Sequence, residues 1–432
     1  MRAKIFLILL FAGLIIKTGI GQDTLILSLE AAKLHALEYN KVIENADMAV
    51  LQARKKLFET IASGLPQAEA SLDYSNFLGA EMEFSFAEGV PPQRIPFNPT
   101  SNFNFTVSQL IFSGSYIIGV QSAKLYREMS ETNRLKTGQE IKEMVSRLYI
   151  NSLMANQFID ILSESLDNTI EIFGKTKAMV SAGIVEEIDI DQFEVQKNTL
   201  ENNLRSAKRQ QEVAYNLLRF QLGVEINKPL NLTDSLHGLM ESVVFIVLLE
   251  DTLLLENNLD FRLMETQEEL TKKQVTQQKM NYLPLLTGFY NYTNKILKPE
   301  FDLSPNNVVG LNLSIPLFSS GLRNARVSQA QIQYKTTLNN KQLLTEQLYL
   351  QQKQAKYNLA TAIEQYQNLK KNVEVAYRVY KNHELKYEQG VFSSLDLITS
   401  YNNYLQAESS YITAINSLFD AQLALQKLLN TL

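Results

Sequence analysis

The chain has 432 residues, of which 45% are hydrophobic and 20% charged, a composition ordinary for a folded protein of two or three domains. Its formal net charge of −5 argues against nucleic acid as a partner, because nucleic acids attract basic surfaces. The absence of cysteine excludes disulfides and a lipid anchor on cysteine.

The first 21 residues have the pattern of a secretory signal peptide. Two basic residues precede an apolar run from Ile5 to Ile16, and small residues follow at Gly19 and Gly21. A membrane anchor would need about 20 apolar residues, but Lys17 interrupts this run. We therefore expect residues 1–21 to be a signal peptide. Its removal takes away three basic residues and no acid, which moves the formal charge from −5 to −8.

Two strands are predicted in the following segment, over about residues 67–86 and 101–113. Apolar and polar residues alternate there with the period of a half-buried strand, the apolar set being Ala68, Ala70, Leu72, Tyr74, Phe103, Phe105 and Val107. Four prolines lie in the loop between the strands, which predicts irregular, solvent-facing chain.

A long helix, a turn at about residues 181–188 and a second helix are predicted next, because no proline occurs between Pro99 and Pro229. The second half repeats this order. Pro284 and Tyr292 match Pro66 and Tyr74 at one offset, with strands expected at about residues 285–296 and 307–318. A nearly continuous helix is predicted from residue 322 to residue 388, followed by a turn at about 388–395.

The chain is therefore expected to contain two structural repeats, residues 22–228 and 229–432, the second beginning with a connecting segment at 229–250. Each repeat has the order helix, strand, strand, long helix, turn, helix, so the predicted fold is mainly α with a small β part. The last helix carries a coiled-coil-like stripe that predicts packing along a seam: Tyr404, Ala407, Tyr411, Ala414, Leu418, Ala421, Leu425 and Leu428.

The four strands have the length and alternation of transmembrane strands. The longest later apolar run, Val243 to Leu249, is too short to cross a bilayer as a helix. Four strands cannot close a barrel, and unpaired edges in hydrocarbon cost several kcal/mol, so several copies must pool their strands. A soluble antiparallel sheet with one wet face is the alternative.

Aromatic residues cluster around the predicted strands and fit an interfacial girdle, although ordinary strand packing uses the same residue types. They are Phe84, Phe86, Phe103, Phe105, Tyr290 and Tyr292.

The two-fold repeat resembles the TolC-like outer membrane efflux protein family. The resemblance lies in Leu65-Pro66 and Leu283-Pro284 before strands, in GLNLSIPLFSSG from Gly310, and in YEQGVFSSLDLITSYNNYLQAESSY from Tyr387. It implies a homotrimer in which three copies of four strands form one 12-stranded barrel in outer membrane lipid, continued by a helical α-barrel in the periplasm. It also implies two further partners, a periplasmic adaptor (membrane fusion) protein and an inner-membrane transporter.

By this resemblance, the two turns form the periplasmic tip that meets the adaptor. The implied docking residues are Gly183, Gly390, Phe392, Ser393 and Ser394, and the implied gate or constriction residues are Asp189, Asp396, Asp191, Glu186 and Glu187. Some family members carry arginine where this chain has Phe392, so a salt-bridged lock is not expected there. Thr399 does not supply the second acidic ring that some members have.

Structural roles account for many of the same residues. A glycine at C′ permits the positive φ of a helix C-cap, serine caps the next helix, and acids near a helix N-terminus favour its dipole. Three copies around an axis would also concentrate negative potential, and a divalent cation held there would be incidental.

No enzymatic activity or cofactor is expected, because His35, His237 and His383 are isolated and no metal-spaced pair or nucleophile motif accompanies them. The predicted function is a passive outer membrane channel of a tripartite efflux or secretion system. The alternatives are a periplasmic coiled-coil adaptor and a structural stalk without a pore.

Overall fold

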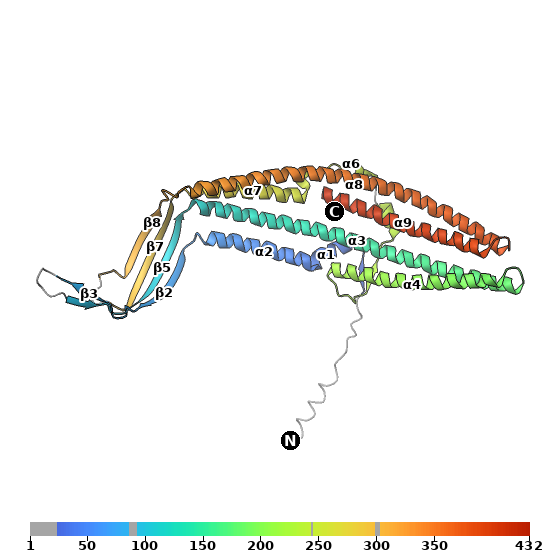
Figure 1. Ribbon diagram of the computed structural model, residues 1–432, viewed down its shortest axis with the longest axis horizontal. Helices are drawn as coiled ribbons and strands as arrows, with labels where there is room; N and C mark the ends of the chain where they lie inside the picture. The colour runs from blue at the N-terminus through green and yellow to red at the C-terminus, as the bar shows by residue number, and fades with distance from the viewer. Residues whose placement is uncertain (1–23, 86–92, 243–244, 299–302) are drawn as a thin grey trace, which may run out of the picture. The chain divides into compact units, whose positions relative to one another are not determined.

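The computed structural model describes residues 24–85, 93–242, 245–298 and 303–432 (Figure 1). The predicted signal peptide, Phe86 and the start of the apolar run at Val243 lie outside the described residues. Within the described part of the chain, no helix combines the length and apolar character needed to cross a membrane.

The helices and strands follow the predicted duplicated order, which confirms the fold class. The first repeat contains α1 (Leu29–Tyr39), α2 (Lys41–Ala62), β2 (Gln67–Ser75), β5 (Thr100–Phe112), α3 (Gly114–Ser181) and α4 (Glu187–Leu222). The second contains α7 (Leu259–Met280), β7 (Leu285–Leu297), β8 (Asn307–Ser314), α8 (Leu322–Glu388) and α9 (Ser394–Leu429). Matching helices are nearly equal in length, with 68 and 67 residues in α3 and α8 and 36 in both α4 and α9.

The chain divides into two compact units that each draw on both repeats. The hairpin unit contains the described chain up to Glu44, Thr137–Leu253 and Tyr349–Leu432. The sheet unit contains Asn45–Lys136 and Leu254–Leu348. Three of the four boundaries between the units therefore fall inside α2, α3 and α8, and the fourth lies between Leu253 and Leu254.

One antiparallel sheet of four strands, in the order β2-β5-β7-β8, forms the β part of the sheet unit (Figure 1). Its central pair, β5 and β7, joins the two repeats. The register places Leu72 opposite Phe103, and Phe105 opposite Tyr292, so apolar side chains share one face.

The other face of the sheet is polar and internally hydrogen-bonded. Asn104 Nδ2 donates to Asp73 at 2.8 Å, Thr293 donates to Asn104 at 2.8 Å, and Thr106 donates to Asn291 at 3.0 Å. Neighbouring strands thus satisfy one another's polar side chains, and the two faces of the sheet differ sharply in polarity.

The predicted strand at 67–86 is wrong in its extent, since β2 ends at Ser75. Leu78 and Gly79 have positive φ values of 51° and 80°, and Asn76 Oδ1 accepts a hydrogen bond from Leu78 N at 2.9 Å. This turn breaks the strand. Two further strands form a separate antiparallel ribbon: β3 (Glu81–Phe84), which lies within the predicted strand, and β4 (Gln93–Pro96), which lies where irregular chain was expected.

Strand β8 also ends earlier than the predicted residue 318, at Ser314. Pro316 follows closely and lacks the backbone N–H that a strand ladder needs. The prediction for α8 is confirmed, because the helix runs from Leu322 to Glu388 without interruption.

The hairpin unit has a small parallel pair of strands that the sequence pattern did not reveal. β1 (Leu25–Leu27) pairs with β6 (Leu230–Leu232), followed by α5 (Leu236–Ser242), α6 (Phe245–Glu250) and the 3-10 turn η1 (Leu255–Asn257). Fully buried Tyr149 places its hydroxyl 3.0 Å from Leu27 O and 2.9 Å from Asp234 Oδ2. Asp234 also accepts from Leu29 N at 2.6 Å, so it satisfies the first turn of α1.

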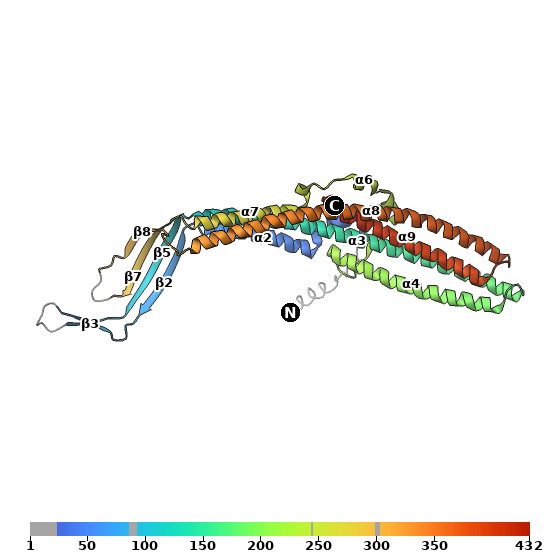
Figure 2. The same ribbon diagram turned by 45° about the horizontal axis from the view of Figure 1, so that its top comes forward.

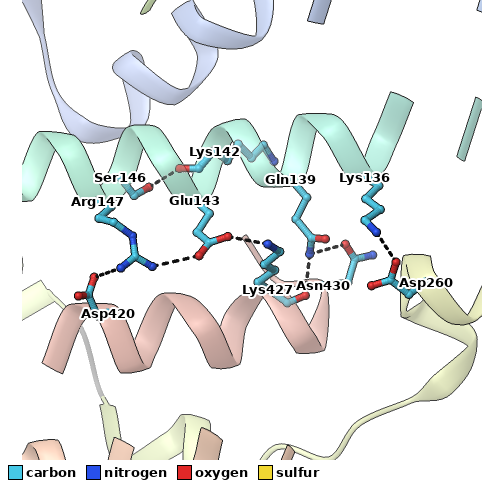
Figure 3. Close-up of polar contacts among 10 residues, drawn as sticks. All are labelled: Lys136, Gln139, Lys142, Glu143, Ser146, Arg147, Asp260, Asp420, Lys427 and Asn430. Carbon is cyan, nitrogen blue, oxygen red and sulfur yellow. Dashed lines mark hydrogen bonds and ion pairs between the residues drawn. The ribbon is translucent and has the colours of Figure 1, made fainter. Parts of the chain in front are cut away.

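A polar seam fixes the end of α9 against α3 within the hairpin unit (Figure 3). Arg147 lies 2.8 Å from Asp420 and 3.1 Å from Glu143, and Glu143 lies 2.8 Å from Lys427. Burial raises the pKa of Asp420, although the nearby Arg147 opposes this shift. Gln139 Nε2 donates to Lys427 O at 2.7 Å, which satisfies a carbonyl in the last turn of α9.

The stripe predicted on α9 is only partly the buried face. Ala414, Leu418 and Leu425 are buried, whereas Tyr404 and Ala421 are half-buried. The buried face also includes residues outside that stripe, namely Ile415, Phe419, Gln422, Leu423 and Leu429.

Candidate functional site at the two hairpin turns

Two antiparallel helical hairpins, α3 with α4 and α8 with α9, lie in the hairpin unit and end in short turns (Figures 1 and 2). Both turns use the same backbone motif. Gly183 has φ 71°, and Gly183 N and Ile184 N donate to Val180 O and Met179 O, each at 2.9 Å. Gly390 has φ 72°, and the corresponding bonds run from Gly390 N to Tyr387 O and from Val391 N to Lys386 O.

These are Schellman C-caps, in which a left-handed residue lets the next amides satisfy the last helix carbonyls. A side chain at Gly183 would meet no atom within 4 Å, whereas one at Gly390 would lie 3.0 Å from Ile184 Cγ2. Positive φ is therefore sufficient to explain glycine at residue 183, and close approach of the other hairpin adds a reason at residue 390.

Polar residues that follow each turn cap the next helix. Asp189 Oδ2 accepts from Glu186 N at 3.2 Å, which is half of a capping box. In the second repeat, Ser393 Oγ accepts from Asp396 N at 3.1 Å and lies 2.7 Å from Asp396 Oδ2. Helix capping thus explains these side chains at the level of local structure.

Asp189 and Asp396 occupy equivalent places in the repeat but have different surroundings. The Ser394 hydroxyl donates to Asp189 Oδ1 from the other hairpin, and it also lies 2.8 Å from Gln192 Oε1. Ser394 is only 2% exposed and Asp189 is half-buried, whereas Asp396 is exposed. Asp189 therefore links the two hairpins, while the hydrogen bonds of Asp396 with Ser393 stay within its own turn.

Two more polar contacts join α3 to α8 just above the turns. Thr176 Oγ1 lies 2.8 Å from the hydroxyl of buried Tyr387, and Lys175 Nζ lies 2.6 Å from Glu388. We call these two pairs and the Asp189–Ser394 bond the tip lock. Burial raises the pKa of Tyr387, and the Asp189 carboxylate adds to the shift. Hydrogen bonds to Glu171 and Glu388 raise the pKa of Lys175.

The tip lock was missed by the sequence analysis apart from its Asp189 and Ser394. Thr176 and Tyr387 sit near the ends of the two longest helices, where a polar residue on the buried face is the available signal. Pairing across the repeats cannot be read from spacing within one helix, because it depends on how the hairpins meet.

The remaining predicted docking and gate residues differ in exposure. Phe392 is half-buried, and its ring lies 4.3 Å from the ring of His383. The exposed apolar side chains at the turns are instead Ile184, Ile188, Val391 and Leu395. Glu186, Glu187 and Asp191 are exposed, and the described residues contain no group of three or more His, Cys, Asp or Glu arranged to hold a metal ion.

Two of the three comparisons with known proteins find matches, one with a family model and one with solved structures. The family model described as outer membrane efflux protein matches residues 252–431. Comparison with curated proteins gives no significant match.

Solved channel structures share the fold along 93% of this chain. The Campylobacter jejuni CmeC outer membrane channel has 17% identity and a TM-score of 0.72, with 85% of that chain covered. The outer membrane protein VceC from Vibrio cholerae has 15% identity and a TM-score of 0.71, with 95% covered. The open state of the Neisseria gonorrhoeae MtrE outer membrane channel has 17% identity and a TM-score of 0.72, with 88% covered.

Proposed function

We propose that this chain belongs to the outer membrane efflux protein family, whose model matches residues 252–431, and that it serves as the outer membrane channel of a tripartite efflux or secretion system. The observation that carries the proposal is the four-stranded sheet with one apolar and one polar face, joined to long duplicated hairpins. A stalk protein without a pore would not require a sheet with one apolar and one polar face. An adaptor would have one hairpin, whereas this chain has two.

The edges of the sheet support assembly into a homotrimer. Strands β2 and β8 each have a single neighbour in the sheet, and an unpaired edge is costly in hydrocarbon. Pairing β2 of one copy with β8 of the next would give three copies of four strands, a closed ring of 12 in outer membrane lipid. The hairpins of the three copies would then form a helical tunnel in the periplasm.

The tip is proposed as both gate and docking surface. Asp189, Asp396, Asp191, Glu186 and Glu187 would line an acidic mouth where three chains converge, with negative potential raised by repetition. The tip lock would hold the two hairpins of each chain together, so opening requires its three contacts to separate.

Docking of a periplasmic adaptor would involve the turns at Gly183 and Gly390, with Phe392, Ser393 and Ser394. Because Ser394 is buried and Phe392 half-buried, these two would become available only as the hairpins spread. The chain would act as a passive, non-enzymatic conduit, with energy supplied by an inner-membrane transporter.

The test is single-channel recording in planar bilayers with protein purified from the outer membrane fraction. The expected result is a trimer that gives discrete conductance steps, small at rest and larger after the tip lock is broken. A trimer that inserts with its hairpins intact and yet gives no conductance would support the stalk instead.

A further inference from the structure

A cavity of about 360 Å³ lies in the hairpin unit, at the start of α1 and along α9. Its apolar wall comprises Leu29, Ile150, Leu239, Phe419 and Leu423. The volume falls within the range of small-molecule sites, which are mostly apolar with a few polar groups that fix orientation. None of the residues proposed above for the gate or the docking surface lines this cavity.

Gln422 supplies the polar group that this cavity leaves unsatisfied. It lies on the wall, is only 6% exposed, and has a buried Oε1 without a hydrogen-bond partner among the described residues. Most buried polar side chains are hydrogen-bonded, so an exception on a cavity wall indicates a missing donor. Gln422 also occupies the buried face of α9 between Leu418 and Leu425, where an apolar residue would pack without penalty.

The charged groups around the cavity favour a cation. Glu30, Lys33 and Asp234 line it, which gives two carboxylates and one ammonium. Lys33 Nζ is already paired with Glu30 at 2.8 Å, so its charge is compensated. Asp234 Oδ2 accepts from Leu29 N and Tyr149, but both of these bonds leave its negative charge in place.

We propose that this cavity is a binding site for a small amphipathic amine. Its ammonium would donate to Gln422 Oε1 and offset the Asp234 charge, while its apolar body would lie against Phe419 and Leu423. The three requirements come from different observations, namely the unpartnered acceptor, the excess of carboxylates and the apolar wall.

The experiment titrates benzylamine against the full-length protein in detergent and follows binding by saturation-transfer NMR. Gln422→Met keeps a similar volume and removes the acceptor, and it is expected to weaken binding about tenfold. Gln406→Met is the matched control, because Gln406 is an exposed residue of the same helix and does not line the cavity. It should leave binding unchanged.

Two ligand analogues test the same idea on the unaltered protein, which makes the result independent of how well the variant folds. Benzyltrimethylammonium keeps the charge but has no N–H, and benzyl alcohol keeps a donor but has no charge; both should bind more weakly than benzylamine. The proposal is overturned if benzylamine does not bind, since the cavity then holds only water. It is also overturned if Gln422→Met binds benzylamine as well as the unaltered protein does, or if the trimethyl analogue binds equally well.

Discussion

The contact between Asp189 and Ser394 makes the gate hypothesis quantitative. Replacing Ser394 with alanine removes the hydroxyl that donates to the Asp189 carboxylate across the two hairpins. A hydrogen bond to a charged group contributes about 1.5–3 kcal/mol. Asp189 is half-buried and can be hydrated when the bond is lost, so the lower end, about 1.5 kcal/mol, applies.

Since about 1.4 kcal/mol corresponds to a factor of ten, the ratio of open to closed hairpin pairs should rise about tenfold in each chain. Single-channel recording in planar bilayers would detect this as a higher open probability or a larger resting conductance. Asp189→Asn should act in the same direction. The double variant should add little, because both changes remove the same bond.

Ser393→Ala is the matched control for this experiment. Ser393 is the neighbouring serine, but its hydroxyl bonds to Asp396 in its own turn and does not reach the other hairpin. Loss of that cap should cost about 1 kcal/mol of helix stability without opening the channel. Equal conductance in Ser393→Ala and Ser394→Ala, or additive effects of Asp189→Asn and Ser394→Ala, would refute the role of the bond in gating.

Three further outcomes are expected. Gly223→Ala should abolish the folded protein, because a Cβ there would lie 2.2 Å from Tyr39 O. Gly183→Ala has a similar φ but open space around it, so it should cost only about 1 kcal/mol of stability. Heat denaturation would compare the two variants, and equal melting temperatures would contradict this expectation. Tyr149→Phe should destabilise the protein by about 2–4 kcal/mol, since Leu27 O and Asp234 lose a buried partner, and an unchanged melting temperature would exclude the hydroxyl as a structural link. Burial, with the Glu164 carboxylate adding to it, raises the pKa of Glu408 above its usual 4.5. Protonation of Glu408 therefore makes the fold more stable as the pH falls from 7 towards 4.5. Glu408→Gln should reduce that gain in melting temperature, and identical pH profiles of the variant and the unaltered protein would contradict the raised pKa.

The long strands and helices of this fold were predictable because their sequence signals are local. Alternation located the long strands, and the proline-free stretch between Gly321 and Gly390 located α8, because both signals act within a single element. The turn at Leu78 and Gly79 shows the limit. It needs positive φ at a leucine, which no composition rule anticipates, and it separates β2 from the ribbon of β3 and β4.

The sequence predicted where the site lies, but it did not predict most of the contacts within it. The glycines, serines and acids of both turns stand out in the sequence, and their roles in gating and docking remain predictions. The repeat made Asp189 and Asp396 look equivalent, yet only Asp189 is bonded by Ser394. That difference arises because Ser394 and its repeat counterpart Glu187 are different residues, and because the hairpins meet asymmetrically.

The parallel pairing of Leu25–Leu27 with Leu230–Leu232 sets an order of events for a nascent chain. The amide of Leu29 bonds to Asp234, 205 residues later, so this amide in the first turn of α1 lacks that acceptor while the whole first repeat emerges. Contacts between residues this distant in sequence form slowly, because the entropic cost of closing the loop comes before any stabilising bond has formed. Until then Leu25 and Leu27 lack their partner strand, so a chaperone that binds exposed apolar segments would be expected to bind here.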